Sequence, residues 1–306
     1  MRIVSLLPSA TEIVCAVGAG EALVGRSHEC DFPAAITDRP VLTRARIALG
    51  DTSGAIDHAV RAVIRDALSL YTVDEQGLAA LAPDVIVTQD LCEVCAVSLD
   101  DVRRAVARLA QREAVEVVSL RPTRLGDVLD DVERVARVLG RAATGASVRG
   151  ELERRIREIE GRAVAAASEG RPNVLSIEWL DPLMIGGTWM PELIELAGGR
   201  AVGAAAGAPA PTIDVRELGR LEPEVIVVKP CGFTIERTLR ERALIEQLAI
   251  GSARVYVTDG NAYFNRPGPR LVESLEIMAA CVHPDRFADF AEKHAGAIVS
   301  VATSRT

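Results

Sequence analysis

The chain has 306 residues, of which 49% are hydrophobic and 25% are charged, and its net charge is −8. This length is too great for one ordinary hydrophobic core and suits two α/β lobes. The negative charge argues against a broad surface for nucleic acid or for an anionic membrane. No apolar run reaches the length of a membrane span.

Met1 and Arg2 lead directly into an apolar run that is typical of a strand. No charged leader with a long apolar segment and a cleavage site precedes this run, so we expect a cytoplasmic protein if Met1 is the native start. In a reducing compartment the six cysteines are expected to be thiols rather than a disulfide framework.

Short β-branched runs alternate with amphipathic segments through the first half, a pattern typical of α/β folds. A strand is predicted over residues 2–7; Pro8 ends it, and Ser9 to Glu12 form a capping box that predicts a helix start. The other elements expected in this half are strands at 22–25, 85–87 and 115–120, a strand or extended turn at 69–74, and helices at 56–67, 75–81, 99–110 and 124–139.

A long amphipathic helix is predicted near the midpoint of the chain, over 146–167, with no strand partner within reach. Its apolar stripe consists of Leu152, Ile156, Ile159 and Val164. We interpret this helix as a rigid connector between two lobes. The predicted domains are an N-terminal α/β lobe at 1–143, a connecting backbone helix at 144–169 and a C-terminal α/β lobe at 170–306.

The second half of the chain repeats the pattern of strands and helices predicted for the first half. Residues 221–227 match residues 81–87 almost position for position, each segment being a leucine, a proline and then a β-branched run. Strands are expected at 173–177, 225–227 and 254–257, the last strand of the chain, and helices at 191–199 and from Pro267 or Pro269 to about residue 280. We therefore predict two Rossmann-like lobes that a single long helix joins, with a ligand cleft between the lobes.

Chemically distinctive side chains follow the predicted strands, at the edge where open α/β sheets bind ligands. These residues are His28, Glu29, Cys30, Cys92, Cys95, Glu178, Trp179, Cys231, Tyr263, Phe264 and Arg266. If the two lobes face each other through these edges, the side chains share one cleft.

A metal site is the first interpretation of these residues. Cys92 and Cys95 have C-x-x-C spacing, and with Cys231, Cys30 and His28 they are the candidate ligands for zinc or iron. No second close pair of cysteines accompanies them, and the alternative is that Cys92 and Cys95 are partly buried thiols without a special role. A thiol redox pair at Cys92 and Cys95 is a further alternative.

A bound organic ligand is the second interpretation. Trp179, Trp189, Tyr263 and Phe264 lie at predicted loop positions and offer flat contact area to a planar or bulky molecule, although a hydrophobic plug between lobes would use the same residues. Arg266 and Arg270 are candidates for contact with ligand carboxylates, and the alternative is that they only cap neighbouring carbonyls and carboxylates. The glutamates Glu178 and Glu29 complete the predicted contacts. The sequence contains no G-x-S-x-G elbow and no H-E-x-x-H motif, so we assign no catalytic residue.

Three segments carry a resemblance to a known family. Residues 2–12, 23–27 and 81–86 resemble the cobalamin and iron-siderophore substrate-binding proteins of ABC importers, and the likeness covers nearly the whole chain. Residues 28–31, 92–96, 178–182, 230–232 and 261–264 are similar to a branch without a signal peptide that is usually labelled cobalamin-binding protein. The resemblance implies two lobes, one long backbone helix, a small-molecule ligand in the cleft and an ABC permease as a partner.

The leading hypothesis is thus a non-enzymatic protein that holds cobalamin or a related metal complex, with Trp179, Tyr263 and Phe264 packed on the macrocycle. The alternative is a cytoplasmic metalloprotein, possibly an enzyme, with a cysteine and histidine site for zinc or iron. In that alternative Glu29 or Glu178 acts as acid or base.

Overall fold

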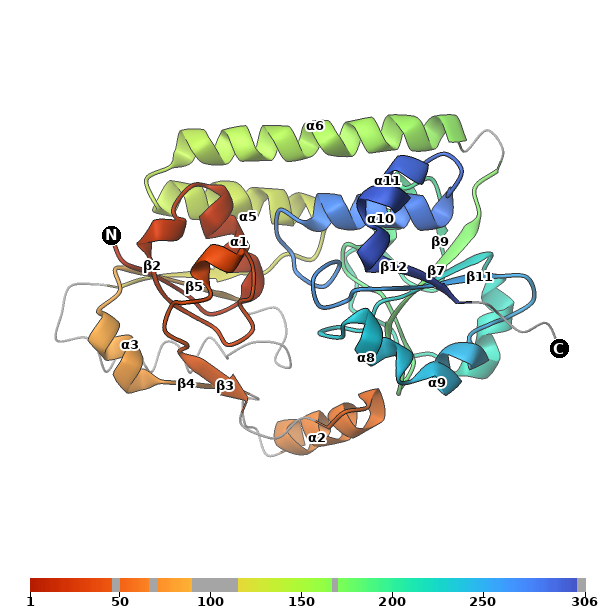
Figure 1. The fold of residues 1–306 in the computed structure, drawn as a ribbon, viewed down its shortest axis with the longest axis horizontal. Coiled ribbons are helices and arrows are strands. Elements are labelled where there is room, and N and C mark those ends of the chain that lie inside the picture. The colour runs from red at the N-terminus through yellow and green to blue at the C-terminus, as the bar shows by residue number, and fades with distance from the viewer. Residues whose placement is uncertain (46–49, 66–70, 90–114, 167–169, 302–306) are drawn as a thin grey trace. The chain divides into compact units, whose positions relative to one another are not determined.

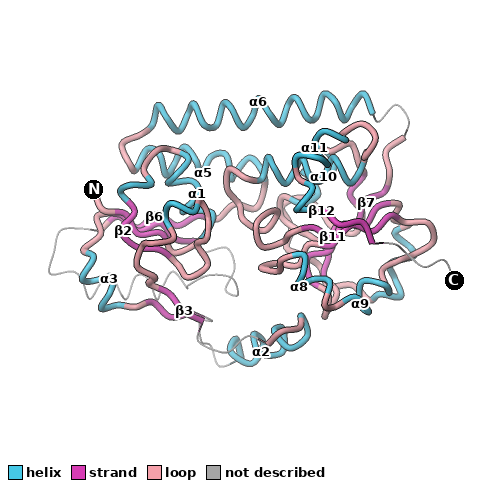
Figure 2. The backbone as a smooth tube through the Cα atoms, viewed as in Figure 1, coloured by secondary structure: helices cyan, strands magenta, loops and turns pink. Residues whose placement is uncertain are grey.

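The structure, a computed structural model, describes residues 1–45, 50–65, 71–89, 115–166 and 170–301. The chain divides into two compact units. Unit 1 comprises Met1–Asp51, Ala55–Pro122 and Gly126–Gly150, and unit 2 comprises Thr52–Gly54, Thr123–Leu125 and Glu151–Thr306. Each unit contains its own sheet, and Figure 2 shows the strands in magenta.

Unit 1 is built on a four-stranded parallel sheet in the order β2-β1-β5-β6. All five residues of β5 are buried, as expected of a central strand with both faces covered. The strands are β1 (Ile3–Ser5), β2 (Leu23–Arg26), β5 (Val85–Gln89) and β6 (Glu116–Leu120), and the accompanying helices are α1 (Pro8–Ala16), η1 (Gly20–Ala22), η2 (Ala34–Ile36), α2 (Ser53–Arg65), α3 (Glu75–Leu81) and α5 (Leu125–Val138).

A second, two-stranded sheet in unit 1 pairs β3 (Thr43–Ala45) with β4 (Tyr71–Val73) in antiparallel register. The sequence predicted extended structure for the second of these segments but gave no sign of its partner. The pairing joins residues 26 to 30 positions apart, so it depends on the tertiary fold rather than on a local turn.

Unit 2 contains a larger sheet in the order β12-β11-β10-β7-β8, with β9 paired to β7. The strands β7, β10 and β11 are parallel to one another, while β8 and β12 run antiparallel to their neighbours. The elements are β7 (Asn173–Trp179), β8 (Met184–Ile185), α7 (Met190–Leu196), β9 (Arg200–Ala201), η4 (Val215–Leu221), β10 (Val225–Val228), α8 (Ile235–Leu239), α9 (Arg242–Gln247), β11 (Arg254–Thr258), α10 (Leu271–Val282), α11 (Ala288–Lys293), η5 (Ala295–Ala297) and β12 (Ile298–Val301).

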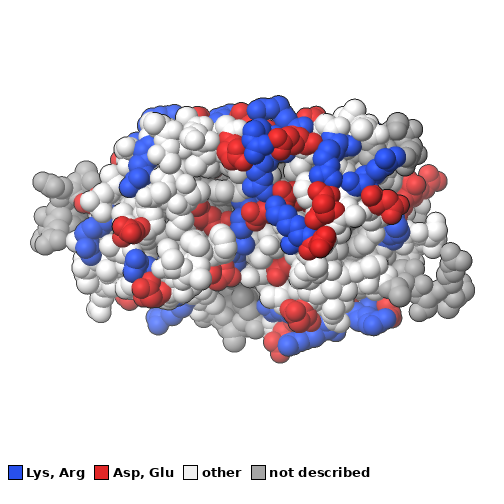
Figure 3. Space-filling view, turned by 45° about the horizontal axis from the view of Figure 1, so that its top comes forward, with Lys and Arg blue, Asp and Glu red and all other residues white. Residues whose placement is uncertain are grey.

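The longest helix among the described residues, α6 (Ala142–Ala166), has 25 residues and appears as one unbroken coil in Figure 1. Leu152 and Ile159 are buried, but Val164 is 68% exposed and Ala163 takes the buried position beside it. Charges of both signs are interspersed on the face shown in Figure 3. Within the described residues, no helix is long and apolar enough to cross a membrane.

The internal repeat is visible in the backbone. Ala82 ends α3 and Glu222 ends η4, and both adopt the left-handed conformation, with φ of 40° and 45°. Each is followed by a proline and then by a buried β-branched strand, β5 or β10. The two matching sequence segments therefore fold into the same helix-to-strand turn, once in each unit.

Some local predictions were wrong. Ser9 does not cap α1: Leu7 is the N-cap, Pro8 occupies the first turn, and the buried Ser9 hydroxyl has no hydrogen-bond partner in the described part of the chain. Proline suits that position because the first amide of a helix has no internal acceptor. The strand β7 extends to Trp179, so Glu178 and Trp179 lie within it. The strand at 254–258 is not the last one, since β12 pairs with it.

Candidate functional site

The register of the unit 2 sheet places Glu178 beside Lys229. Val228 lies opposite Ile177, and the amide of Lys229 continues the ladder by donating to the Ile177 carbonyl at 2.9 Å. The Lys229 side chain is fully buried, and its Nζ lies 3.3 Å from Glu178 Oε2. The Glu178 side chain is 29% exposed, so it contacts both the buried ammonium and solvent. This charged pair lies at the carboxyl ends of two parallel strands, where open α/β sheets bind ligands.

Asn265 connects Lys229 to the loop that follows β11, residues 259–266. Its Oδ1 accepts from Lys229 Nζ at 3.0 Å, and its Nδ2 donates to the carbonyls of Lys229 at 3.1 Å and of Gly260 at 2.9 Å. A β-carbon at Gly260 would lie 2.2 Å from the carbonyl oxygen of Pro230. The loops after β10 and β11 are therefore packed backbone against backbone.

The turn at Phe264 is held from both sides. Phe264 has φ of 63°; its amide donates to Ser274 Oγ at 2.9 Å, and its carbonyl accepts from Trp189 Nε1 at 2.8 Å. Left-handed backbone is rare for a bulky residue, and these buried hydrogen bonds maintain it here. The Phe264 ring is fully buried inside unit 2, and its direct contact with a ligand stays a prediction.

Tyr263 and Arg266 lie on the same loop. The half-buried Tyr263 ring has its centroid 5.5 Å from the guanidinium carbon of Arg270 and 6.1 Å from the ring of His294. Arg266 is 7% exposed and donates to Asn261 Oδ1 at 3.2 Å. The side chains of Tyr263 and Arg266, both predicted ligand contacts, are thus held by contacts with other residues of unit 2.

Trp179 ends β7 and is partly exposed. Its ring meets the buried Phe233 ring edge-on, with 5.2 Å between centroids, and its Nε1 donates to the Asp181 carbonyl at 3.0 Å. The guanidinium of Arg237 lies 4.0 Å from the Phe233 centroid. An indole held in this way offers a flat apolar surface to a planar ligand.

In unit 1, the loop after β2 presents His28 and Glu29. The exposed His28 ring has its Nδ1 2.7 Å from Thr43 Oγ1, and its centroid lies 5.2 Å from the Tyr71 ring. The Tyr71 hydroxyl donates to Glu29 Oε1 at 3.0 Å. With Nδ1 engaged, the imidazole can present Nε2 to a metal centre, which is the usual arrangement of a ligating histidine.

The described cysteines do not form a metal site. Cys30 is fully buried in unit 1, where its Sγ accepts from the Thr11 hydroxyl at 3.0 Å, whereas Cys231 is partly exposed in unit 2. Within the described ranges, no group of three or more His, Cys, Asp and Glu side chains could hold a metal ion. Cys92 and Cys95 lie outside the described residues. Metal binding by the predicted set is therefore not supported.

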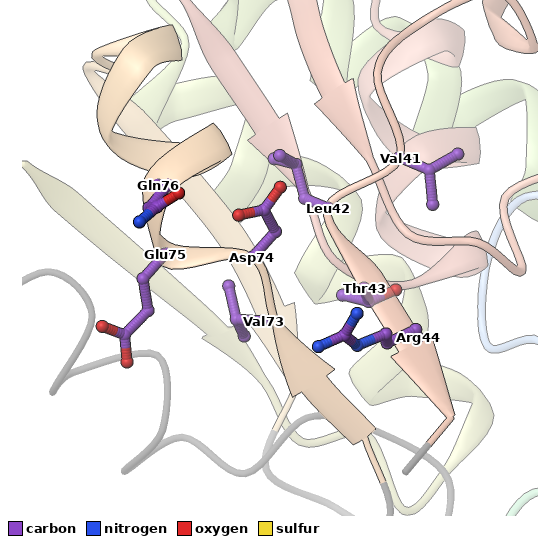
Figure 4. Close-up of a pocket in the computed structure, with 8 residues that line it drawn as sticks. All are labelled: Val41, Leu42, Thr43, Arg44, Val73, Asp74, Glu75 and Gln76. Atoms are coloured by element: carbon purple, nitrogen blue, oxygen red, sulfur yellow. The ribbon is translucent and has the colours of Figure 1, made fainter.

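A pocket of about 470 Å³ lies in unit 1, between two segments that run side by side in Figure 4. Its lining consists of Val41, Leu42, Thr43 and Arg44 from one segment and Val73, Asp74, Glu75 and Gln76 from the other. None of the binding residues predicted from the sequence lines it. Thr43, one of the lining residues, also contacts the His28 side chain.

Sequence reasoning missed Lys229, Asn265 and Tyr71. A lysine directly after four β-branched residues was a usable signal for Lys229, because such a position continues a buried strand. Asn265 and Tyr71 gave no comparable signal, since their partners are 36 and 42 positions away.

Comparison with known proteins gives one family and a consistent fold. The profile of the family described as "Periplasmic binding protein" matches residues 3–262. The vitamin B12-binding protein of Vibrio cholerae is 23% identical over 281 residues, which cover 90% of this chain and 86% of that protein.

Two solved structures extend the comparison. A periplasmic heme-binding protein from Pseudomonas aeruginosa has a TM-score of 0.70 at 20% identity, covering 99% of this chain and 95% of that one. The periplasmic vitamin B12-binding protein of Vibrio cholerae has a TM-score of 0.62 at 20% identity, covering 95% and 98%. At this identity the likeness shows the fold, and it confirms the predicted two-lobed α/β architecture with one long helix.

The prediction of a cytoplasmic location was wrong. The matching family profile describes periplasmic proteins, and both solved structures are of periplasmic proteins. The prediction relied on the residues before the first strand. A cleaved export leader is no part of the folded domain, so the start of a chain does not decide where that domain works.

Proposed function

This chain belongs to the periplasmic binding protein family, and on that basis we propose that it binds cobalamin or a closely related metal tetrapyrrole as the receptor of an ABC importer. The resemblance seen in the sequence is confirmed at the level of the family. The ligand and the permease partner are the parts that we propose.

The arrangement of unit 2 is the observation that carries the proposal. Glu178 and the partly exposed indole of Trp179 end β7, Lys229 follows β10, and the half-buried phenol of Tyr263 lies in the loop after β11. The contacts of Lys229 with Glu178 and Asn265 connect these segments. A corrin ring has broad apolar faces and a rim of amides. Flat aromatic side chains suit the faces, and a carboxylate can accept hydrogen bonds from the amides.

Titration with cyanocobalamin tests the proposal directly. We expect saturable binding, measured by calorimetry and by quenching of the fluorescence of the two tryptophans. Trp179→Ala should weaken binding on the order of tenfold, because a large flat contact is lost. Val164→Ser, at an exposed position on α6, is the matched control and should leave affinity unchanged. Absence of saturable binding at 100 µM ligand would contradict cobalamin as the ligand.

Heme is the second candidate, and His28 is the observation that favours it. Its Nδ1 contacts Thr43 Oγ1, the arrangement in which an imidazole presents Nε2 to iron. Titration with hemin should then give a Soret band that shifts in His28→Ala. A wild-type protein that binds cyanocobalamin and ignores hemin would exclude this candidate.

A further inference from the structure

The chain contains only two lysines, Lys229 and Lys293, among its 35 basic residues. Lys229 is also one of the largest fully buried side chains, and it lies at the end of a central strand of unit 2. A buried ammonium is strongly destabilising unless partners compensate its charge and its hydrogen bonds. Loss of a partner of Lys229 would therefore leave a buried charge uncompensated, and this cost keeps the partners in place.

Those partners come from the two segments that carry the proposed ligand contacts. Glu178 Oε2 lies 3.3 Å from Nζ and Asn265 Oδ1 lies 3.0 Å from it. Asn265 also donates back to the Lys229 carbonyl at 3.1 Å. Lys229 thus joins the partly exposed carboxylate of Glu178, near the end of β7, to the loop 259–266. It contacts the loop through both its side chain and its backbone.

Close contacts with neighbouring backbone restrict the conformation of the loop 259–266. Gly260 lies against the carbonyls of Pro230 and Lys229, at positions where a β-carbon would come within 2.2 Å and 2.7 Å of their oxygens. Asp259 Oδ1 accepts the amides of Asn261 and Ala262 at 2.9 Å and 2.8 Å. The loop is therefore ordered from within, and Asn265 connects it to the buried lysine.

We propose that Lys229 is a positioning residue for ligand binding: its buried ammonium holds Glu178 and the loop 259–266 in their binding arrangement before the ligand arrives. This inference rests on the proposed function, because Glu178, Tyr263 and Arg266 are the contacts it would position. A loop held in advance costs less entropy to order on binding, so Lys229 acts on affinity without touching the ligand.

Lys229→Met tests the inference, because methionine keeps much of the apolar stem and removes the charge and the donors. We expect cyanocobalamin to bind on the order of tenfold more weakly. In the unliganded protein, hydrogen exchange at the amides of Tyr263 and Phe264 should accelerate, while exchange in β10 stays slow. Arg162→Met, which removes the contact with Asp289 elsewhere in unit 2, should lower stability and leave both readouts unchanged.

Asn265→Ala provides a second variant in case Lys229→Met folds poorly. If Lys229 and Asn265 act through the same interaction, their effects on affinity should not add. The double variant should then bind no more weakly than whichever single variant has the lower affinity. A purely structural role would instead lower stability and leave affinity and loop exchange as in the wild type.

The outcomes separate the two proposals. Wild-type protein that binds neither cyanocobalamin nor hemin overturns the proposed function, and the exchange measurement still tests the positioning role. Wild-type protein that binds, with Lys229→Met equal to it in affinity and in loop exchange, overturns the positioning role alone.

Discussion

Glu276 Oε2 accepts a hydrogen bond from His294 Nε2 at 2.7 Å, which joins the middle of α10 to the residue after α11. The same carboxylate contacts Lys293 Nζ at 2.7 Å and Arg155 Nη2 of α6 at 2.8 Å. Burial disfavours the charged form, but the hydrogen bonds from His294, Lys293 and Arg155 outweigh it and hold the pKa of Glu276 at about 2. This cluster connects three helices within unit 2.

Stability should therefore fall in acid. The pKa of Glu276 is lower in the folded state than its ordinary value of 4.5, so its contribution is complete above that value and is lost as pH falls toward 2. Glu276→Gln should cost at most about 3 kcal/mol at pH 7 and progressively less below pH 4.5. Urea unfolding at a series of pH values measures this, and a cost that does not change with pH would contradict it.

The contribution of Asp131, on α5 of unit 1, to stability changes with pH in the opposite direction. It is 7% exposed, and its Oδ2 has no hydrogen-bond partner among the described residues. Burial raises the pKa of Asp131 to about 6, although Arg134 lies 2.8 Å from its other oxygen and partly offsets the effect. The folded state thus binds this proton more tightly than the unfolded state, whose ordinary value is 3.8. The Asp131 contribution to stability is greatest below pH 3.8 and is lost as pH rises through 6.

Asp131→Asn should consequently stabilise the protein at pH 8 by roughly 1–3 kcal/mol, with the gain disappearing below pH 4. Asp130→Asn is the control on the same helix: its side chain is 67% exposed and pairs with Arg149, so it should change stability by less than about 1 kcal/mol. Thermal unfolding at pH 4, 6 and 8 distinguishes the variants. A loss of stability in Asp131→Asn at pH 8 would refute the assignment.

Two equivalent turns allow a matched test of backbone strain. Glu222 and Ala82 have positive φ, which is unfavourable for any residue other than glycine. Glu222→Gly and Ala82→Gly should each stabilise the protein by up to about 1 kcal/mol. Glu217→Gly, within η4 and without positive φ, should destabilise it instead. Chemical denaturation compares the three, and destabilisation by all of them would show that the turns are not strained.

Gly260→Ala should separate the loops that follow β10 and β11. The added β-carbon would lie 2.2 Å from the Pro230 oxygen, and the obstacle is backbone rather than a flexible side chain. We expect a loss of roughly 1–3 kcal/mol in stability and weaker ligand binding. Gly219→Ala is the control, since nothing lies within 4 Å of its β-carbon position. Equal behaviour of the two variants in unfolding and binding would contradict the close packing.

The sequence was sufficient for the type and order of the central elements. The β-branched runs at β5 and β10 are typical of buried parallel strands, and the repeated leucine and proline before them indicated that the second half of the chain repeats the first. The long amphipathic helix could also be predicted from the sequence, and it corresponds to the 25-residue α6. Its length and the lack of a strand partner within reach distinguished it from the other predicted helices. These features are local, so neighbouring residues are enough to specify them.

The tertiary structure alone decided which polar groups meet. Lys229 looked like the end of a strand, but its contacts with Glu178 and Asn265 depend on the register of β7 against β10 and on the path of a loop 36 positions further on. The pairing of β12 with β11 and the burial of Phe264 are decided in the same way. The sequence determined the elements because hydrophobic periodicity acts over a few residues. The site required the fold, because burial and charge compensation act between groups that only the packed chain brings together.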